Sequence, residues 1–173
     1  MENQSKIQFT GFYGQADPNV KNHSWDTIKR ISRMVKEDWI VGGDFNAIMD
    51  DAEKMRTRRK PRMQIDEFRE VLEELPLVDI KTTRGWFAWI NNRDGNKLVK
   101  KRLDRFVMAA NTFSVFPFIE ANVIRHTKSD HDVVLLDTLV RKPKEKQKDP
   151  RLSFKFNACW ANDKRANEII KNV

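Results

Sequence analysis

The sequence has little cysteine and no long apolar run. Cys159 is the only cysteine among 173 residues, so the chain can form neither an internal disulfide nor a cysteine-based zinc site. No stretch has the roughly 20 consecutive apolar residues that a helix needs to cross a bilayer, and the first residues lack the hydrophobic core of a secretory signal. These features predict an intracellular protein, nuclear or cytoplasmic, with no membrane partner and no disulfide-linked partner. They leave the oligomeric state open.

Positive charge is concentrated in the last part of the chain. The sequence holds 33 Lys and Arg against 25 Asp and Glu, a net charge of +8. Residues 141–173 contain ten basic and four acidic side chains, whereas residues 1–140 contain 23 and 21. The stretch 141–150 is basic and polar and ends in proline, which is typical of a linker. We therefore expect one domain over residues 1–140, a basic linker over 141–150 and a connecting segment over 151–173.

Apolar periodicity predicts an alternation of strands and helices. One helix should begin near Ser24, which can cap it, and a second should cover residues 64–75 and stop at Pro76. Strands are expected at 7–13, 39–45, 77–80, 86–90, 98–108, 123–125 and 132–139. This mixture predicts an α/β (α+β) fold, a partial four-layer sandwich of two packed mixed β-sheets flanked by helices.

Two polar side chains follow an apolar run that ends in glycines. Residues 39–46 read Trp-Ile-Val-Gly-Gly-Asp-Phe-Asn. Because side chains alternate along an extended chain, Asp44 and Asn46 should lie on one side while Phe45 points into the core. A carboxylate and an amide oxygen presented together suit Mg²⁺. The alternative is an Asx-type turn, in which Asp44 binds its own backbone.

Three further polar groups stand at or near the ends of predicted strands. Tyr13 closes the first strand, Asp104 lies within Arg-Leu-Asp-Arg-Phe at 102–106, and Ser-Asp-His occupies 129–131 before an apolar strand. Together with Gly-Gly-Asp-Phe-Asn, these motifs resemble, in order, the endonuclease/exonuclease/phosphatase superfamily, whose fold is that of deoxyribonuclease I. The likeness is closest to the endonuclease domain of plant LINE-type (non-LTR) retrotransposons, and it covers about residues 5–140.

The resemblance implies a phosphodiester hydrolase that uses Mg²⁺ or Mn²⁺ and acts on DNA. The implied catalytic residues are Asp44, Asn46, Asp104, His131 and Tyr13, and the implied metal ligands are Asp130 and Asp44. Asp104 would hold the imidazole of His131, since a carboxylate on the far nitrogen of a histidine fixes its tautomer and orientation. Tyr13 would contact the scissile phosphate.

The resemblance also implies that a section of the domain is missing. Family members carry an Asn and a metal-binding Glu on strands ahead of the tyrosine strand, whereas here only Met1 to Lys6 precede that strand. The resemblance therefore implies an N-terminally truncated remnant that is weakly active or inactive.

Two basic clusters suggest a polyanion-binding surface. Six of the nine residues from 54 to 62 are basic, and a second cluster covers 97–105. Such clusters bind a phosphate backbone by counterion release, although solvated charged loops are at least as common. The expected DNA-binding residues are Arg58, Arg59, Lys60, Arg62, Lys100, Lys101 and Arg102. Two alternatives remain, a non-catalytic basic nucleic-acid-binding fragment and a phosphatase or phosphodiesterase of the same superfamily. Trp86 and Trp89 are expected in the core.

Overall fold

The computed structural model describes residues 6–56, 61–126 and 128–139. The expected linker at 141–150, the segment 151–173 and the expected DNA-binding residues Arg58, Arg59 and Lys60 lie outside this part of the chain. No helix within the described ranges has the length and apolar character needed to cross a membrane.

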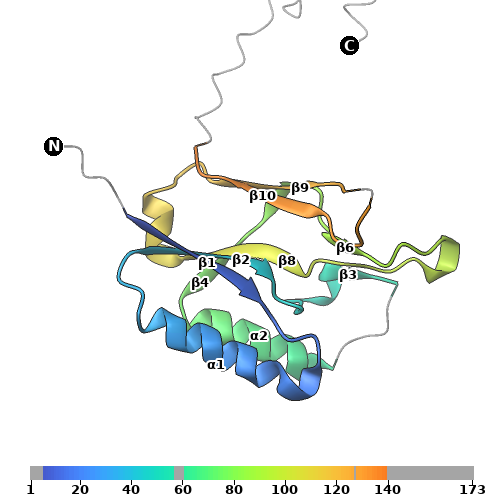
Figure 1. Ribbon diagram of the computed structural model, residues 1–173, viewed down its shortest axis with the longest axis horizontal. Helices are drawn as coiled ribbons and strands as arrows, with labels where there is room; N and C mark the ends of the chain where they lie inside the picture. Colours follow the sequence, from blue (N-terminus) through green and yellow to red (C-terminus); the bar gives the residue numbers. More distant parts are fainter. Residues whose placement is uncertain (1–5, 57–60, 127, 140–173) are drawn as a thin grey trace, which may run out of the picture. The chain divides into compact units, whose positions relative to one another are not determined.

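A four-stranded mixed sheet forms the centre of the fold (Figure 1). Its order is β1 (Ile7–Tyr13), β2 (Asp38–Asp44), β8 (Asp104–Ala109) and β4 (Leu77–Ile80). β1 runs parallel to β2, whereas β8 runs antiparallel to both of its neighbours. β2 therefore lies inside the sheet, and its apolar residues are buried on both faces, as a continuous apolar run predicts.

Two helices cover one face of this sheet, α1 (Lys21–Ser32) and α2 (Arg62–Glu74). Their inward side chains pack with those of β1, β2 and β8 in one cluster that includes Trp25, Phe45, Phe68 and Val107. The expected cap at Ser24 is wrong. Ser24 lies inside α1, because the chain enters this helix through the 3₁₀ turn η1 (Pro18–Val20), and its Oγ accepts a hydrogen bond from the Gln15 nitrogen at 2.8 Å.

A second sheet packs on the opposite face of the central sheet. Its order is β10 (Val133–Asp137), β9 (Glu120–Ile124) and β5 (Thr82–Arg84). Ile40, Met108 and Ala121 meet between the two sheets, with Phe106 and Leu136 packed around them. Both sheets are mixed, so the expected α/β sandwich is confirmed.

A third, small sheet was not expected. It consists of β3 (Lys54–Met55), β7 (Lys100–Lys101) and β6 (Trp89–Ile90), and 3₁₀ turns η2 (Asp51–Glu53), η3 (Gly95–Lys97) and η4 (Ala110–Ser114) complete the fold. The strand expected over 98–108 is divided into β7 and β8, because the chain changes partners between them. β7 pairs with β3 and β6, whereas β8 pairs with β2 and β4.

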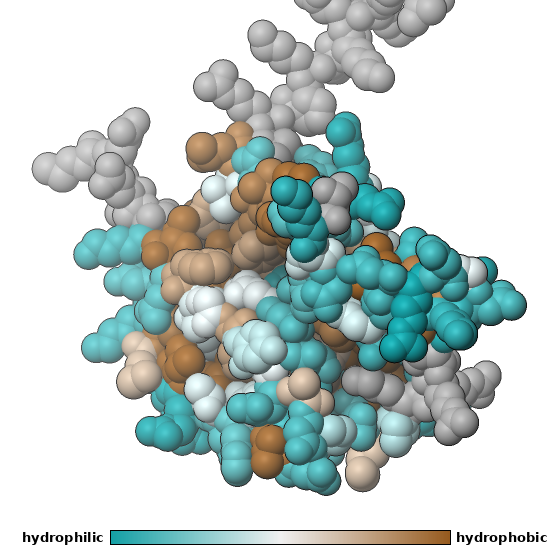
Figure 2. Space-filling model, turned by 45° about the vertical axis from the view of Figure 1, so that its right-hand side comes forward, coloured by the Kyte–Doolittle hydropathy of each residue, from teal (hydrophilic) through white to brown (hydrophobic). Residues whose placement is uncertain are grey.

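Apolar side chains are exposed on β1 and on the second sheet. Within the described ranges no strand pairs with the outer edge of β1, and Phe9 on this strand is 60% exposed. Val133 and Leu135 on β10 are also about half exposed, at 52% and 48%. Figure 2 shows apolar side chains gathered on one face of the molecule.

Gly43 is expected to tolerate no side chain. Its φ is +147°, and a Cβ there would lie 2.0 Å from the carbonyl oxygen of Phe12 on β1. We expect Gly43→Ala to lower the free energy of unfolding by about 1–3 kcal/mol, the usual cost of a disallowed backbone conformation. Gly11→Ala on β1 is the matched control, since no atom lies within 4 Å of its Cβ position. Urea unfolding of both variants tests this, and equal midpoints would contradict it.

Candidate active site

The pairing of two central strands brings two carboxylates together. Asp44 at the end of β2 is the Cα partner of Asp104 at the start of β8. Residues opposite each other in an antiparallel pair present their side chains on the same face of the sheet, about 4.5–5.5 Å apart. Two carboxylates at such a distance repel each other unless a cation or a hydrogen-bond donor lies between or beside them.

His131 lies just before β10 of the second sheet, and backbone hydrogen bonds of its neighbours position it. The segment before β10 pairs with the chain around β6, through Ile90 N to Asp130 O at 2.8 Å and Asp132 N to Ala88 O at 2.6 Å. The His131 amide donates to Ser129 Oγ at 3.1 Å, which closes a local turn. His131 is therefore presented towards the central sheet at the point where β10 begins.

The imidazole of His131 contacts one carboxylate and faces the other. Its Nδ1 lies 2.9 Å from Asp104 Oδ2, and its Nε2 lies 4.0 Å from Asp44 Oδ2. The expected hydrogen bond between Asp104 and His131 is confirmed. One ligand atom of each of these three residues lies within 4.8 Å of the others. The His131 side chain is 35% exposed, so it is partly open to solvent.

The pKa of His131 is raised above its ordinary value of 6.5. Burial alone would lower this pKa, but the hydrogen bond to Asp104 and the charges of Asp104, Asp44 and Asp130 outweigh it. The pKa of Asp104 is also raised, because burial and the nearby Asp44 outweigh the stabilising hydrogen bond from His131. The raised pKa keeps the imidazole protonated to a higher pH than that of an ordinary histidine, and its Nε2 faces the space beside Asp44.

Asp44 takes part both in an Asx-type turn and in this cluster. Its Oδ1 accepts from the Asn46 backbone nitrogen at 2.8 Å, while its Oδ2 faces His131. The side-chain Nδ2 of Asn46 donates to Asp44 Oδ2 at 3.1 Å and to the Gly14 oxygen at 2.8 Å. Phe45 points into the core and is fully buried, as expected. The Asx-type turn at Asp44 is therefore part of the candidate site.

Two of the expected site residues stand apart from the cluster. Asp130 is exposed, and its Oδ2 accepts from Trp89 Nε1 at 3.0 Å. Tyr13 is the Cα partner of Asp44 across β1 and β2 and is 76% exposed. Tyr13 therefore lies on the strand next to Asp44, with its side chain exposed to solvent. Asp130 directly precedes His131 in the chain.

Arg102 was expected to bind DNA, and this prediction is wrong. The residue is 1% exposed, and its guanidinium is bound to Glu53 and to Asp79. Lys100 and Lys101 are half-buried, and burial and the charge of Lys54 lower the pKa of Lys101.

Trp86 and Trp89 are both half-buried, and Trp89 packs against the buried residues Ile48, Ile65 and Leu103, so its expected place in the core is confirmed in part. The Nζ of Lys101 lies 5.0 Å from the ring centroid of Trp89, within cation–π distance. Arg62 is exposed at the start of α2.

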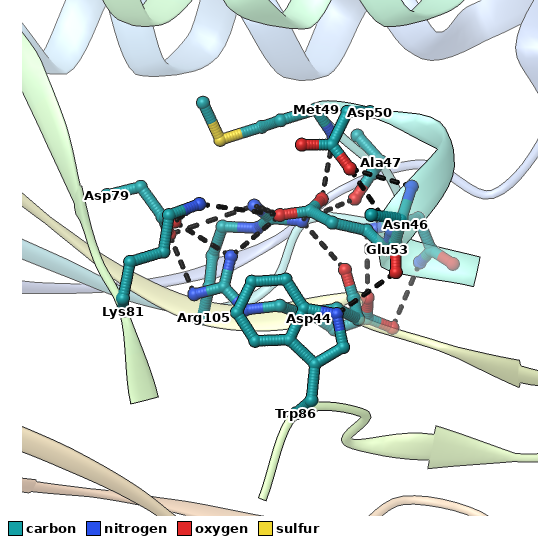
Figure 3. A network of polar contacts seen from close by, with 12 residues as sticks. Asp44, Asn46, Ala47, Met49, Asp50, Glu53, Asp79, Lys81, Trp86 and Arg105 are labelled. Carbon is teal, nitrogen blue, oxygen red and sulfur yellow. Dashed lines mark hydrogen bonds and ion pairs between the residues drawn. The ribbon is translucent and has the colours of Figure 1, made fainter. Parts of the chain in front are cut away.

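The structure also contains a buried network of ion pairs around Glu53, which the sequence did not predict (Figure 3). Glu53 is fully buried and accepts from Arg105 at 2.8 Å and from Arg102 at 2.9 Å. Arg102 also forms a forked pair with Asp79 at 2.8 and 3.0 Å, and Lys81 lies 2.8 Å from the same carboxylate. Burial would raise the pKa of Glu53, but the hydrogen bond and charge of Arg105 outweigh it and lower this pKa.

One signal for this network was present in the sequence. Alternation along the strand places Arg105 on the face opposite to Asp104, which is the face that packs under the helices. A charged residue on a core face requires an oppositely charged partner. Nothing in the sequence identified Glu53 as that partner.

The donor atoms of the cluster fit a hard divalent cation. Carboxylate oxygens are the ligands that Mg²⁺ and Mn²⁺ prefer, and Mg²⁺ is commonly held by one or two carboxylates together with water and substrate phosphates. Asp104 is already bound to Nδ1 of His131. Both oxygens of Asp44 likewise accept hydrogen bonds, from Asn46. Asp44 and Asp104 are therefore the two carboxylates that could hold a metal here.

No family model and no curated protein matches the sequence. Among solved structures, the endonuclease domain of TRAS1, a telomere-specific non-LTR retrotransposon, aligns with a TM-score of 0.58 at 21% identity, over 82% of this chain and 62% of that one. The chain shares the fold of this endonuclease domain. A truncated TDP2 from Caenorhabditis elegans aligns with a TM-score of 0.43 at 16% identity, over 76% of this chain and 54% of that one. The chain thus spans less than two thirds of either structure.

Proposed function

We propose that the protein is a metal-dependent endonuclease of the deoxyribonuclease-I-like superfamily that hydrolyses phosphodiester bonds of DNA. The observation that carries this proposal is the arrangement of His131 between Asp104 and Asp44, with Nδ1 held at 2.9 Å and Nε2 open towards the second carboxylate. The shared fold with a retrotransposon endonuclease domain supports it.

Each residue of the site would have a different role in hydrolysis. Protonated His131 would donate from Nε2 to a phosphoryl or leaving-group oxygen, while Asp104 on Nδ1 holds the ring in the required tautomer. Asp44 would orient the attacking water, with Asn46 and Tyr13 contacting the phosphate. Mg²⁺ or Mn²⁺ bound by Asp44, with Asp130 nearby, would neutralise the charge that develops on the phosphoryl oxygens.

We further propose that the chain is related to LINE-type elements and that its activity is weak. Among the described residues, Asp44 and Asp104 are the carboxylates that cluster with His131, and Asp104 is hydrogen-bonded to it. The alignment with the TRAS1 endonuclease domain covers 62% of that domain. Residues 1–140 would form the catalytic domain and act on DNA inside the cell, in the nucleus or cytoplasm.

A comparison of substrates tests the proposed class of reaction. We expect Mg²⁺-dependent nicking of supercoiled plasmid DNA and little release of phosphate from inositol phosphates, since basic side chains such as Lys100 and Arg62 can hold a polyanion backbone. Faster hydrolysis of the phosphomonoesters than of plasmid would contradict a DNA endonuclease and indicate a phosphatase.

The rate of cleavage should depend on the protonation of His131. Because its pKa is raised above 6.5, the rate should be high below that raised pKa and should fall as the pH increases through it. Asp104→Asn removes a negative charge that raises this pKa and leaves a weaker, neutral acceptor for Nδ1, so the decline should move to lower pH. The measurement is kcat/KM for plasmid nicking against pH. A decline at the same pH in both proteins would contradict this assignment.

A further inference from the structure

Two consecutive carbonyls in the loop after β2 each accept a hydrogen bond from a buried cation. Nζ of Lys21 donates to the Asn46 oxygen at 2.5 Å, and Nη2 of Arg105 donates to the Ala47 oxygen at 3.0 Å. Lys21 is 5% exposed and Arg105 is 1% exposed. Because a buried charge is unfavourable unless hydrogen bonds compensate it, these contacts are required parts of the fold.

The two cations approach the loop from different elements. Lys21 is the first residue of α1, and its Nζ lies 5.8 Å from the ring centroid of Trp25 on the same helix. Arg105 belongs to β8, and its Nη2 also donates to the Arg102 oxygen at 2.7 Å (Figure 3). The loop is thus tied both to the helical layer and to the strand that carries Asp104.

The two fixed carbonyls adjoin the groups that hold the Asp44 carboxylate. Asn46 has a left-handed backbone with φ of 50°, and its backbone and side-chain nitrogens donate to the two oxygens of Asp44. The Lys21 and Arg105 contacts restrain the two peptides that follow Asn46, the residue whose nitrogens bind Asp44 in its place 4.0 Å from His131. We propose that Lys21 and Arg105 are positioning residues that hold Asp44 and Asn46 through these carbonyls. The catalytic part of this inference rests on the proposed function.

The test compares two lysines of the same helix in the 173-residue chain. Lys21→Met keeps the length and packing of the side chain but removes the donor, so we expect kcat to fall by about 10–100-fold, as for other residues that orient a catalytic group, with KM little changed. Lys21→Arg, which keeps a cationic donor, should recover much of the loss. Lys29→Met is the matched control, because Lys29 pairs with the exposed Glu74 at the surface.

A second readout does not depend on activity. Hydrogen exchange of the Asn46 amide, which is bonded to Asp44, should be faster in Lys21→Met than in Lys29→Met. If Lys21→Met does not fold, Arg105→Lys, which keeps the charge but loses the forked donor, is measured in the same way. Failure of the wild-type chain to cleave DNA would refute the proposed function, and the exchange data would then decide the positioning role. Equal kcat and equal Asn46 exchange in Lys21→Met and Lys29→Met would overturn this inference.

Discussion

Replacing His131 by alanine is expected to lower the rate of Mg²⁺-dependent DNA cleavage by about 10²–10⁴-fold, the usual contribution of a general acid or base. The variant removes the imidazole that faces Asp44 and the donor that Asp104 binds through Nδ1. The side chain is 35% exposed, so folding should be little affected. Single-turnover nicking of supercoiled plasmid is the measurement.

His126→Ala is the matched control for this experiment. His126 is exposed, and its hydrogen bond to Asp132 is donated by the backbone nitrogen, which the substitution retains. We expect this variant to cleave at the wild-type rate. Equal rates for His131→Ala and His126→Ala would contradict the role assigned to His131.

Removing Glu53 is expected to lower the free energy of unfolding by about 3–5 kcal/mol, the cost of leaving buried partners of an ion pair uncompensated. Glu53→Ala would leave Arg105 and Arg102 buried beside a cavity with one acidic partner, Asp79. The substitution also removes the acceptor of the Met49 amide, which helps to shape the loop after Asn46. Urea unfolding followed by fluorescence of the five tryptophans measures the effect.

Glu74→Ala is the control for Glu53→Ala, because Glu74 forms a largely exposed pair with Lys29 and should contribute no more than about 1 kcal/mol. The pKa of Glu53 is lowered in the folded state, so its contribution is complete above the ordinary pKa of 4.5 and is lost as the pH falls through the lowered value. Wild-type stability should therefore fall in acid more steeply than that of Glu53→Ala. Parallel acid unfolding curves would contradict this assignment.

The strands that carry the site could be predicted, because their apolar runs are strongly patterned. The first strand was predicted with the bounds that β1 shows, and β2 and β4 lie within one residue of the expected positions. The places of Asp44, Asp104 and His131 at or near strand ends could also be predicted. Their pairing depends on the register of β2 with β8, which the sequence pattern alone does not fix.

The partners of the buried charges could not be predicted from local pattern. Arg102 lies in a basic cluster and was interpreted as a surface residue, because burial of an arginine depends on distant acids such as Asp79, 23 positions away. The same holds for Lys21, whose partner Asn46 lies 25 positions further along the chain. A cluster of charged residues in a sequence shows only that these residues are present. Tertiary packing decides which partner each of them has.

The most direct test of the central claim is metal-dependent nicking of supercoiled plasmid by the wild-type chain and by the double variant Asp44→Asn/His131→Ala. The two proteins should share one fold, checked by circular dichroism and by urea unfolding. We predict slow nicking by the wild type with Mg²⁺ or Mn²⁺, none above background with EDTA, and none by the double variant under either condition. Equal nicking by the wild type and the double variant, or nicking that persists in EDTA, would contradict a metal-assisted active site formed by Asp44, Asp104 and His131.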